Sequence, residues 1–139
     1  MAGYLPPPVG ARASRSRTIA AEDIALFTRI SGDRNPLHYD DAAADRFGGV
    51  IVQGGVTTAI LNAVVAEDLP GPGTVFLSVQ WDFRAAARPG DTITGHVEVT
   101  ASRSDKPVTH LSTWVTNQHG EVLVEGSAVT YTVPLGEGG

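Results

Sequence analysis

The chain has 139 residues, a mass of 14.5 kDa and a formal net charge of −5, which suits a single domain with its own hydrophobic core. Apolar residues make up 42% of the sequence, so extensive disorder is excluded, and the acidic balance argues against broad binding to nucleic acid. Cysteine is absent, which excludes disulfides, thiolate zinc sites and a cysteine nucleophile. No apolar run is long enough to predict a membrane span.

The chain opens with a proline-rich segment, residues 1–8, which we expect to be a flexible tail. Prolines stand there where a signal peptide needs an apolar helix, so we expect a cytoplasmic protein. The domain is expected to cover residues 9–134, and the glycine-rich residues 135–139 are expected to be frayed. Arginines that alternate with small residues over 12–17 predict an edge strand with solvated charges.

A first helix is predicted by the spacing of Ile24, Phe27 and Ile30, which lie three residues apart and are expected to form one apolar stripe. Two acidic residues at its start are favourably placed near the positive end of the helix dipole. Gly32 then supplies a residue that can end the helix.

Two further helical segments are predicted. Asp40 or Asp41 is expected to cap a short helical turn in the sequence DAAADRF. Residues 56–67 are apolar almost all round, which predicts a buried helix. The proline and glycine residues at 69–73 end that helix.

The rest of the chain has strand character. Apolar and polar residues alternate in four stretches separated by short turns, at 75–83, 92–101, 108–116 and 121–133. Gly126, inside the last stretch, is expected to mark a bulge. Short turns between strands favour antiparallel pairing. The sequence therefore predicts an α+β domain whose antiparallel sheet wraps around a buried central helix.

Several common kinds of catalytic and ligand site have no motif in this sequence. The G-x-S-x-G turn of serine hydrolases, the phosphate-binding loop and the dinucleotide glycine pattern are all missing. The histidines His38, His96, His110 and His119 are scattered and form none of the usual metal-ligand pairs. We therefore expect no metal site.

The segment from Asp33 to His38, sequence DRNPLH, has a different character. Asp33 and His38 flank a rigid Asn-Pro turn, so a carboxylate and an imidazole can converge on one small volume. Such a pair suits proton transfer to or from a bound water. The alternative is that Asp33 and Asn35 only hydrogen-bond the backbone of the turn.

A second feature is the sequence Gln53-Gly54-Gly55 at the start of the apolar helix. Backbone N–H groups at a helix start lack intrahelical partners, and glycine allows a substrate to approach the backbone closely. The segment is therefore a candidate oxyanion site that polarises a carbonyl. The alternative is that the glycines only allow a sharp turn against the sheet.

Together, and in this order, the sequences SGDRNPLHYD, FGGVIVQGG and VTASRSDKP resemble the R-specific enoyl-CoA hydratases and the wider MaoC-like dehydratases, which have the hot-dog fold. The resemblance covers about residues 9–134, and the D-x-N-P-x-H motif is quite specific. It implies that Asp33 and His38 are the catalytic pair and that Asn35 is structural. It also implies that the Gly54 N–H polarises the thioester carbonyl.

The sequence departs from the family pattern at the start of the central helix. Gln53 stands in place of the usual histidine and Gly55 in place of the usual methionine. Glutamine still donates and accepts hydrogen bonds but does not titrate. Asn62 falls where some relatives carry a serine that lines the site, so we expect it to contact the substrate or to bond within the core.

The implied reaction is the reversible hydration of a 2-enoyl thioester to a 3-hydroxyacyl thioester. The carrier is coenzyme A or an acyl carrier protein, and no metal or redox cofactor is needed because the thioester itself acidifies C2. The acyl chain is expected between helix and sheet, near Ala59 and Ala63. Four loop cations are candidates for the carrier phosphates, with solvated loop charges as the alternative: Arg84, Arg88, Arg103 and Lys106.

Two other functions remain open at this point. A thioesterase is the other common activity of hot-dog domains, and it too would use a helix start and a carboxylate-activated water. A non-catalytic subunit is the second alternative, supported by Gln53. Only 18% of residues are charged, and sheets of the family pair edge to edge, so we expect a homodimer.

Overall fold

A computed structural model describes residues 5–135 of the chain. The elements, in chain order, are β1 (Arg12–Thr18), α1 (Glu22–Ser31), the 3₁₀ turns η1 (Pro36–His38) and η2 (Asp45–Phe47), α2 (Gly54–Ala63), the π-helical turn η3 (Val64–Asp68), β2 (Thr74–Phe83), β3 (Thr92–Ser102), β4 (Val108–Thr116) and β5 (Val122–Thr132).

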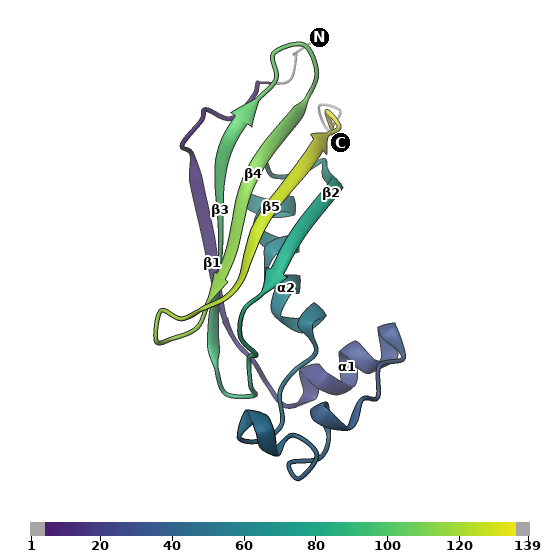
Figure 1. The fold of residues 1–139 in the computed structure, drawn as a ribbon. Helices are drawn as coiled ribbons and strands as arrows, with labels where there is room; N and C mark the ends of the chain where they lie inside the picture. Colours follow the sequence, from purple (N-terminus) through teal and green to yellow (C-terminus); the bar gives the residue numbers. More distant parts are fainter. Residues whose placement is uncertain (1–4, 136–139) are drawn as a thin grey trace.

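The strands form one five-stranded antiparallel sheet in the order β1-β3-β4-β5-β2. Helix α2 lies along one face of this sheet, and α1 with the two 3₁₀ turns lies beyond one end of it (Figure 1). The end of β5 lies toward the opposite end. The predicted α+β hot-dog architecture, a sheet around a central helix, is therefore confirmed.

The core lies between the sheet and α2. Leu61 on α2 and Val64 just after it are completely buried, and they belong to the same cluster as Val97, Leu111 and Val124 from three strands. On β3 the buried residues alternate with half-buried ones, which is the period-two pattern that the sequence shows. Burial of each such side chain contributes about 1.5–3 kcal/mol, so the helix is held firmly against the sheet.

The first helix buries a different stripe from the one expected. Ile24 and Thr28 are buried, but Ile30 is 84% exposed. Residues three apart on a helix are offset by about 60° at each step, so Ile30 lies about 120° away from Ile24. The spacing predicted the helix correctly and its buried face only in part.

The central helix begins at Gly54, two residues before its expected start, and continues through η3 to Asp68. The two glycines at its start are helical rather than part of the preceding turn. The helix packs on the sheet as expected, but one side of it is exposed, at Ala59, Asn62 and Ala66.

Two local expectations are also corrected. Gly126 marks no bulge, because it stands in regular register opposite both Trp81 and Thr113. A Cβ at that position would lie 1.8 Å from the Gln80 carbonyl oxygen, so close approach of the β2 backbone explains the glycine. Only Asp45–Phe47 is helical in the DAAADRF segment.

The ends of the domain are only partly described. Residues 1–4 of the expected tail and 136–139 of the expected frayed end lie outside the described residues. Residues 5–8 form no helix or strand, and the Pro7 carbonyl accepts a hydrogen bond of 2.8 Å from the Ser102 hydroxyl. The boundaries at 9 and 134 stay a prediction. Within residues 5–135, no helix is long and apolar enough to cross a membrane.

Candidate active site

The turn after α1 brings the predicted pair together. Asp33 Oδ1 accepts a 3.0 Å hydrogen bond from the Asn35 N–H, and Asn35 Oδ1 accepts one of 3.1 Å from the Leu37 N–H. These bonds fold the chain so that His38 Nε2 lies 3.6 Å from Asp33 Oδ2. The backbone role considered for Asp33 and Asn35 is therefore real, and it coexists with the carboxylate–imidazole pair. Asn35 itself serves the turn.

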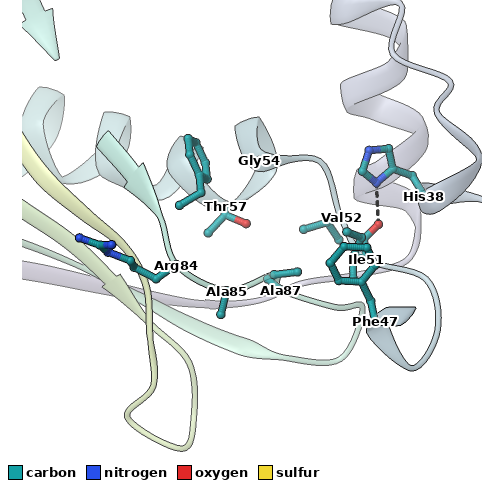
Figure 2. A pocket seen from close by; sticks show the side chains of 11 residues that line it. His38, Phe47, Ile51, Val52, Gly54, Thr57, Arg84, Ala85 and Ala87 are labelled. Carbon is teal, nitrogen blue, oxygen red and sulfur yellow. Dashed lines mark hydrogen bonds between the residues drawn. The ribbon is translucent and has the colours of Figure 1, made fainter. Parts of the chain in front are cut away.

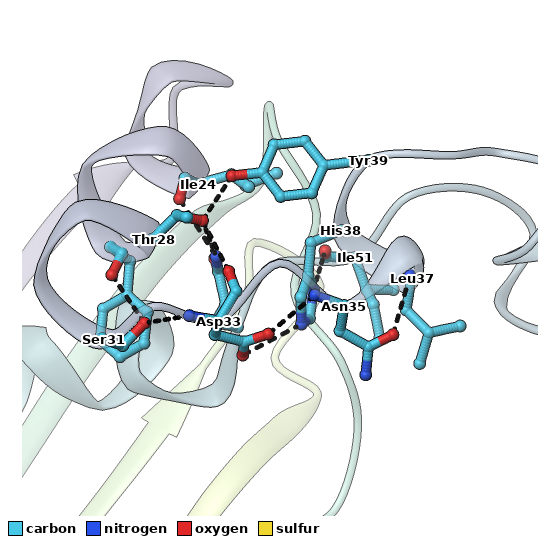
Figure 3. A network of polar contacts seen from close by, with 11 residues as sticks. Ile24, Thr28, Ser31, Asp33, Asn35, Leu37, His38, Tyr39 and Ile51 are labelled. Carbon is cyan, nitrogen blue, oxygen red and sulfur yellow. Dashed lines mark hydrogen bonds and ion pairs between the residues drawn. The ribbon is translucent and has the colours of Figure 1, made fainter.

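The hydrogen-bond partner of His38 Nδ1 indicates the tautomer of the ring. Nδ1 lies 2.7 Å from the Ile51 carbonyl oxygen, which can only accept, so Nδ1 carries a hydrogen (Figure 3). A neutral His38 then presents the lone pair of Nε2 toward the Asp33 carboxylate. Two acceptors face each other across 3.6 Å, which is too long for a direct hydrogen bond. A molecule with two hydrogens, such as water, can donate one to each.

The two partners differ in exposure. The His38 side chain is 9% exposed and the Asp33 side chain is 38% exposed. The imidazole is therefore fixed inside the protein, whereas the Asp33 carboxylate stays in contact with solvent and is not among the residues that line the cavity described below.

The backbone of Asp33 is held by α1. The Ser31 hydroxyl accepts a 3.0 Å hydrogen bond from the Asp33 N–H, and the Thr28 hydroxyl donates one of 2.7 Å to the Asp33 carbonyl (Figure 3). The Thr28 hydroxyl also contacts the Tyr39 hydroxyl. Since its single hydrogen goes to Asp33, the Thr28 oxygen can only accept from its other partners.

One of those partners is Gln53, whose side chain is 1% exposed. Its Nε2 donates to the Thr28 hydroxyl at 3.2 Å and to the Ile24 carbonyl at 3.1 Å. Gln53 therefore points toward α1 and does not line the pocket described below, so the substrate contact expected of it is not made by its side chain. Instead it links the residue before Gly54 to the turn that carries Asp33.

The start of α2 provides free backbone donors. Gln53 is the N-cap residue, and the first hydrogen bond at this end runs from the Val56 N–H to the Gln53 carbonyl. The N–H groups of Gly54 and Gly55 come before any intrahelical acceptor. The dipole of α2 adds positive potential at the same place.

A cavity of about 310 Å³ joins the helix start to the histidine (Figure 2). Its lining comes from the turn after α1, the segment before α2, the first turn of α2 and the chain that leaves β2: His38, Phe47, Ile51, Val52, Gly54, Thr57, Phe83, Arg84, Ala85, Ala86 and Ala87. Most of these side chains are apolar, so the cavity suits an acyl group beside a few polar contacts.

Asn62 is not part of this cavity. Its side chain is exposed, and it is not among the residues that line the cavity. Its exposure does not support a bond within the core, and its expected contact with the substrate stays a prediction.

The lining also contains residues that sequence reasoning missed. Thr57, Phe47 and Phe83 were not singled out, and neither were the alanines at 85–87. The position of Thr57, one helical turn after Gly54, is the one signal in the sequence that could have identified it.

The remaining histidines lie elsewhere. His96 stacks on Trp114 with ring centroids 5.0 Å apart, and burial lowers its pKa below the ordinary value. His110 and His119 are exposed. Among residues 5–135, no three side chains of the metal-ligating types gather in one place.

The comparisons with known proteins show to which family the chain belongs. A family model described as a MaoC like domain matches residues 7–121. The chain belongs to the MaoC-like dehydratase family. A curated member from Aeromonas caviae, named (R)-specific enoyl-CoA hydratase, is 37% identical over 123 residues, covering 87% of this chain and 92% of the relative. A 3-hydroxybutyryl-CoA dehydratase from Methylorubrum extorquens is 34% identical over 123 residues, covering 87% and 78%.

The solved structures of this family include a similar chain. The structure of an (R)-hydratase from A. caviae superposes with a TM-score of 0.86 at 36% identity, covering 91% of this chain and 98% of that one. The family resemblance and the hot-dog fold inferred from the sequence are thus both confirmed.

Proposed function

We propose that this MaoC-like protein is a lyase that reversibly hydrates 2-enoyl thioesters to (R)-3-hydroxyacyl thioesters. The observation that carries the proposal is the 3.6 Å separation of Asp33 Oδ2 and His38 Nε2, with His38 lining the same cavity as Gly54 at the start of α2. The family relatives named as R-specific hydratases support the reaction and its stereochemistry.

The reaction divides between the two sides of the site. A water that donates one hydrogen to Asp33 and one to His38 is oriented with its oxygen lone pair toward C3 of the enoyl group. As the C3–O bond forms, the pair takes one proton from the water, and the π electrons move toward the thioester oxygen. The Gly54 N–H and the dipole of α2 stabilise that enolate oxygen. A proton delivered to C2 by the pair completes the addition of one water.

The acyl group is expected in the 310 Å³ cavity, against Val52, Ala85 and Ala87. The site first expected near Ala59 and Ala63 is a separate cavity of about 270 Å³, which those alanines share with residues of β1. Since neither His38 nor Gly54 lines that second cavity, it does not serve the reaction.

The carrier, coenzyme A or an acyl carrier protein, is expected to approach over the segment after β2. Arg84 and Arg88 line a wider, polar cavity that shares Phe47, Ala85 and Ala86 with the acyl pocket. Arg84 is paired with Glu125 at 3.0 Å, whereas Arg88 donates to the Gly49 carbonyl. These two arginines are candidates for the carrier phosphates.

The other two cations proposed for this role lie elsewhere. Arg103 and Lys106 belong to the β3–β4 turn, at the end of the sheet opposite α1 and the site (Figure 1). Arg103 also pairs with Asp105. Neither residue lies where it would meet the carrier.

The exposed apolar side chains of β2 support a homodimer that forms through this strand. β2 is an edge strand, and Val75, Leu77, Val79 and Phe83 on it are between 45% and 59% exposed. A long apolar edge strand is an aggregation hazard unless another chain pairs with it. Because Phe83 also lines the acyl pocket, the interface would lie beside the site. The cytoplasmic location and the lack of nucleic-acid binding stay predictions.

The direct test is hydration of crotonyl-CoA by the purified protein, followed by the loss of the enoyl absorbance, with a thiol reagent in parallel. The proposal expects hydration without release of free thiol, and loss of at least about 100-fold in rate in Asp33→Asn and in His38→Gln. Circular dichroism checks that both variants are folded. Thiol release would instead favour the thioesterase.

The non-catalytic alternative is tested by the same assay run over several enoyl chain lengths. A folded wild-type protein that hydrates none of them would support a non-catalytic subunit. Gln53, which suggested that alternative, is buried against α1 and is not among the residues that line the pocket.

A further inference from the structure

Two neighbouring threonines on α2 have different hydroxyl environments. The Thr58 hydroxyl donates to the Gly55 carbonyl at 3.4 Å, which is the usual intrahelical bond of a threonine. Thr57 is only 3% exposed, yet its hydroxyl makes no hydrogen bond to any other group within residues 5–135. A buried hydroxyl without a partner costs about 1–3 kcal/mol, so its position calls for an explanation.

The Thr57 hydroxyl opens onto the acyl pocket. In Figure 2 it points into the cavity, toward the side where Val52 and His38 lie. The one fully enclosed side-chain polar atom without a partner in the described chain is Gln53 Oε1. The Thr57 oxygen is therefore reached from the cavity, and a molecule bound there can supply its missing partner.

Helix geometry places this hydroxyl beside the free backbone donor. Thr57 follows Gly54 by three residues, so both lie on one side of α2 and are separated by about 4.5 Å along its axis. Side chains on a helix lean toward its N-terminus, which brings the Thr57 hydroxyl back toward the level of Gly54. Both donors thus serve the same end of the pocket.

We propose that the Thr57 hydroxyl is a second hydrogen-bond donor to the thioester carbonyl oxygen, alongside the Gly54 N–H. The inference rests on the proposed hydration of enoyl thioesters. An enolate oxygen has lone pairs for two donors, and each donor aimed at the developing charge lowers the barrier. The hydroxyl is neutral and rotates freely, so it holds this position without the cost of burying a charge.

The test compares Thr57→Val, Thr57→Ser and the matched control Thr58→Val in the hydration of crotonyl-CoA. Thr57→Val keeps the shape of the side chain and removes the donor, so kcat falls by about 100-fold while KM changes little. Thr57→Ser restores the hydroxyl and most of kcat. Thr58→Val stays near the wild type. A Thr57→Val enzyme with kcat within about threefold of the wild type would overturn the proposal.

A spectroscopic readout separates this proposal from the proposed function. Crotonyl-CoA labelled with ¹³C at the thioester carbonyl is bound to His38→Gln, and its carbonyl stretching frequency is compared with that in His38→Gln/Thr57→Val. Loss of one donor raises the frequency in the double variant. An unchanged frequency excludes a contact between Thr57 and the carbonyl, whether or not the wild type turns over. A wild-type protein inactive on all enoyl thioesters would instead overturn the hydratase assignment.

Discussion

Replacing Gln53 by methionine is expected to lower activity strongly while leaving stability nearly unchanged. Methionine keeps the length of the side chain but removes both donors, so the link from the start of α2 to Thr28 is lost. Thr28 retains its hydrogen bond to the Asp33 carbonyl. The substitution therefore breaks the path of hydrogen bonds that runs from position 53 through Thr28 to the turn that carries Asp33. Among the side-chain hydrogen bonds of residues 5–135, no other path joins position 53 to that turn.

The two effects on stability oppose each other. Two hydrogen bonds are lost, each with a net value of about 1 kcal/mol. The change also removes Gln53 Oε1, a fully buried acceptor without a partner in the described chain, whose burial costs about 1–3 kcal/mol. The free energy of unfolding of Gln53→Met should therefore lie within about 1 kcal/mol of the wild type.

In catalysis, by contrast, no gain offsets the loss of these two hydrogen bonds. A displacement of about 1 Å between reacting groups can cost about 100-fold in rate, and Gln53 helps to set the spacing between Asp33 and the Gly54 N–H. We expect kcat for crotonyl-CoA to fall by about 10- to 100-fold. Thr28→Val, which removes the other end of the link, should lower kcat similarly, and the double variant should show less than the product of the two effects.

Urea unfolding and hydration kinetics on the same preparations measure both quantities. Gln53→His, which introduces the residue usual in the family, is the informative companion because it can still donate one hydrogen bond. Full activity in Gln53→Met would refute the positioning role. A loss of more than about 3 kcal/mol in stability would refute the cancellation argued above.

Two further predictions concern the sheet. Gly126→Ala should lower stability by more than about 3 kcal/mol in thermal or urea unfolding, because its Cβ would lie 1.8 Å from the Gln80 carbonyl oxygen, a backbone atom. Gly95→Ala should lose less, because its Cβ would meet side chains, Ile60 at 2.8 Å and Leu61 at 3.3 Å, and equal losses would contradict the reasoning. Val79→Lys should give a folded monomer in sedimentation velocity, because it places a charge in the exposed β2 edge, and a persistent dimer would show that this edge is not the interface.

The part of the site that the sequence predicts well is local. Asp33 and His38 are five residues apart in a segment whose own hydrogen bonds fold the Asn-Pro turn, so their convergence can be predicted from the local sequence. The Ile51 carbonyl that orients the His38 ring comes from a later segment and could not be predicted in this way. The strands were predictable for a similar reason, because alternation along β3 and β4 shows directly which face is buried.

The rest depends on how α2 is rotated against the sheet. Its sequence is apolar almost all round, so periodicity does not tell which side is exposed. The role of Asn62 was inferred from the family pattern, which does not show that its side chain is exposed here. The same ambiguity hid the difference between Thr57 and Thr58, which point about 100° apart. The direction of Gln53 is set by the packing of α1, a tertiary contact that no local pattern reports.

The most direct measurement is the stereochemistry of hydration in D₂O. Asp33 and His38 hold the water on one face of the enoyl group and also return the proton to C2, so hydroxyl and deuterium should add to the same face. Proton NMR of the 3-hydroxybutyryl product from crotonyl-CoA gives the relative configuration at C2 and C3. Syn addition is the result predicted by a single acid–base pair opposite the Gly54 N–H, and anti addition would contradict it.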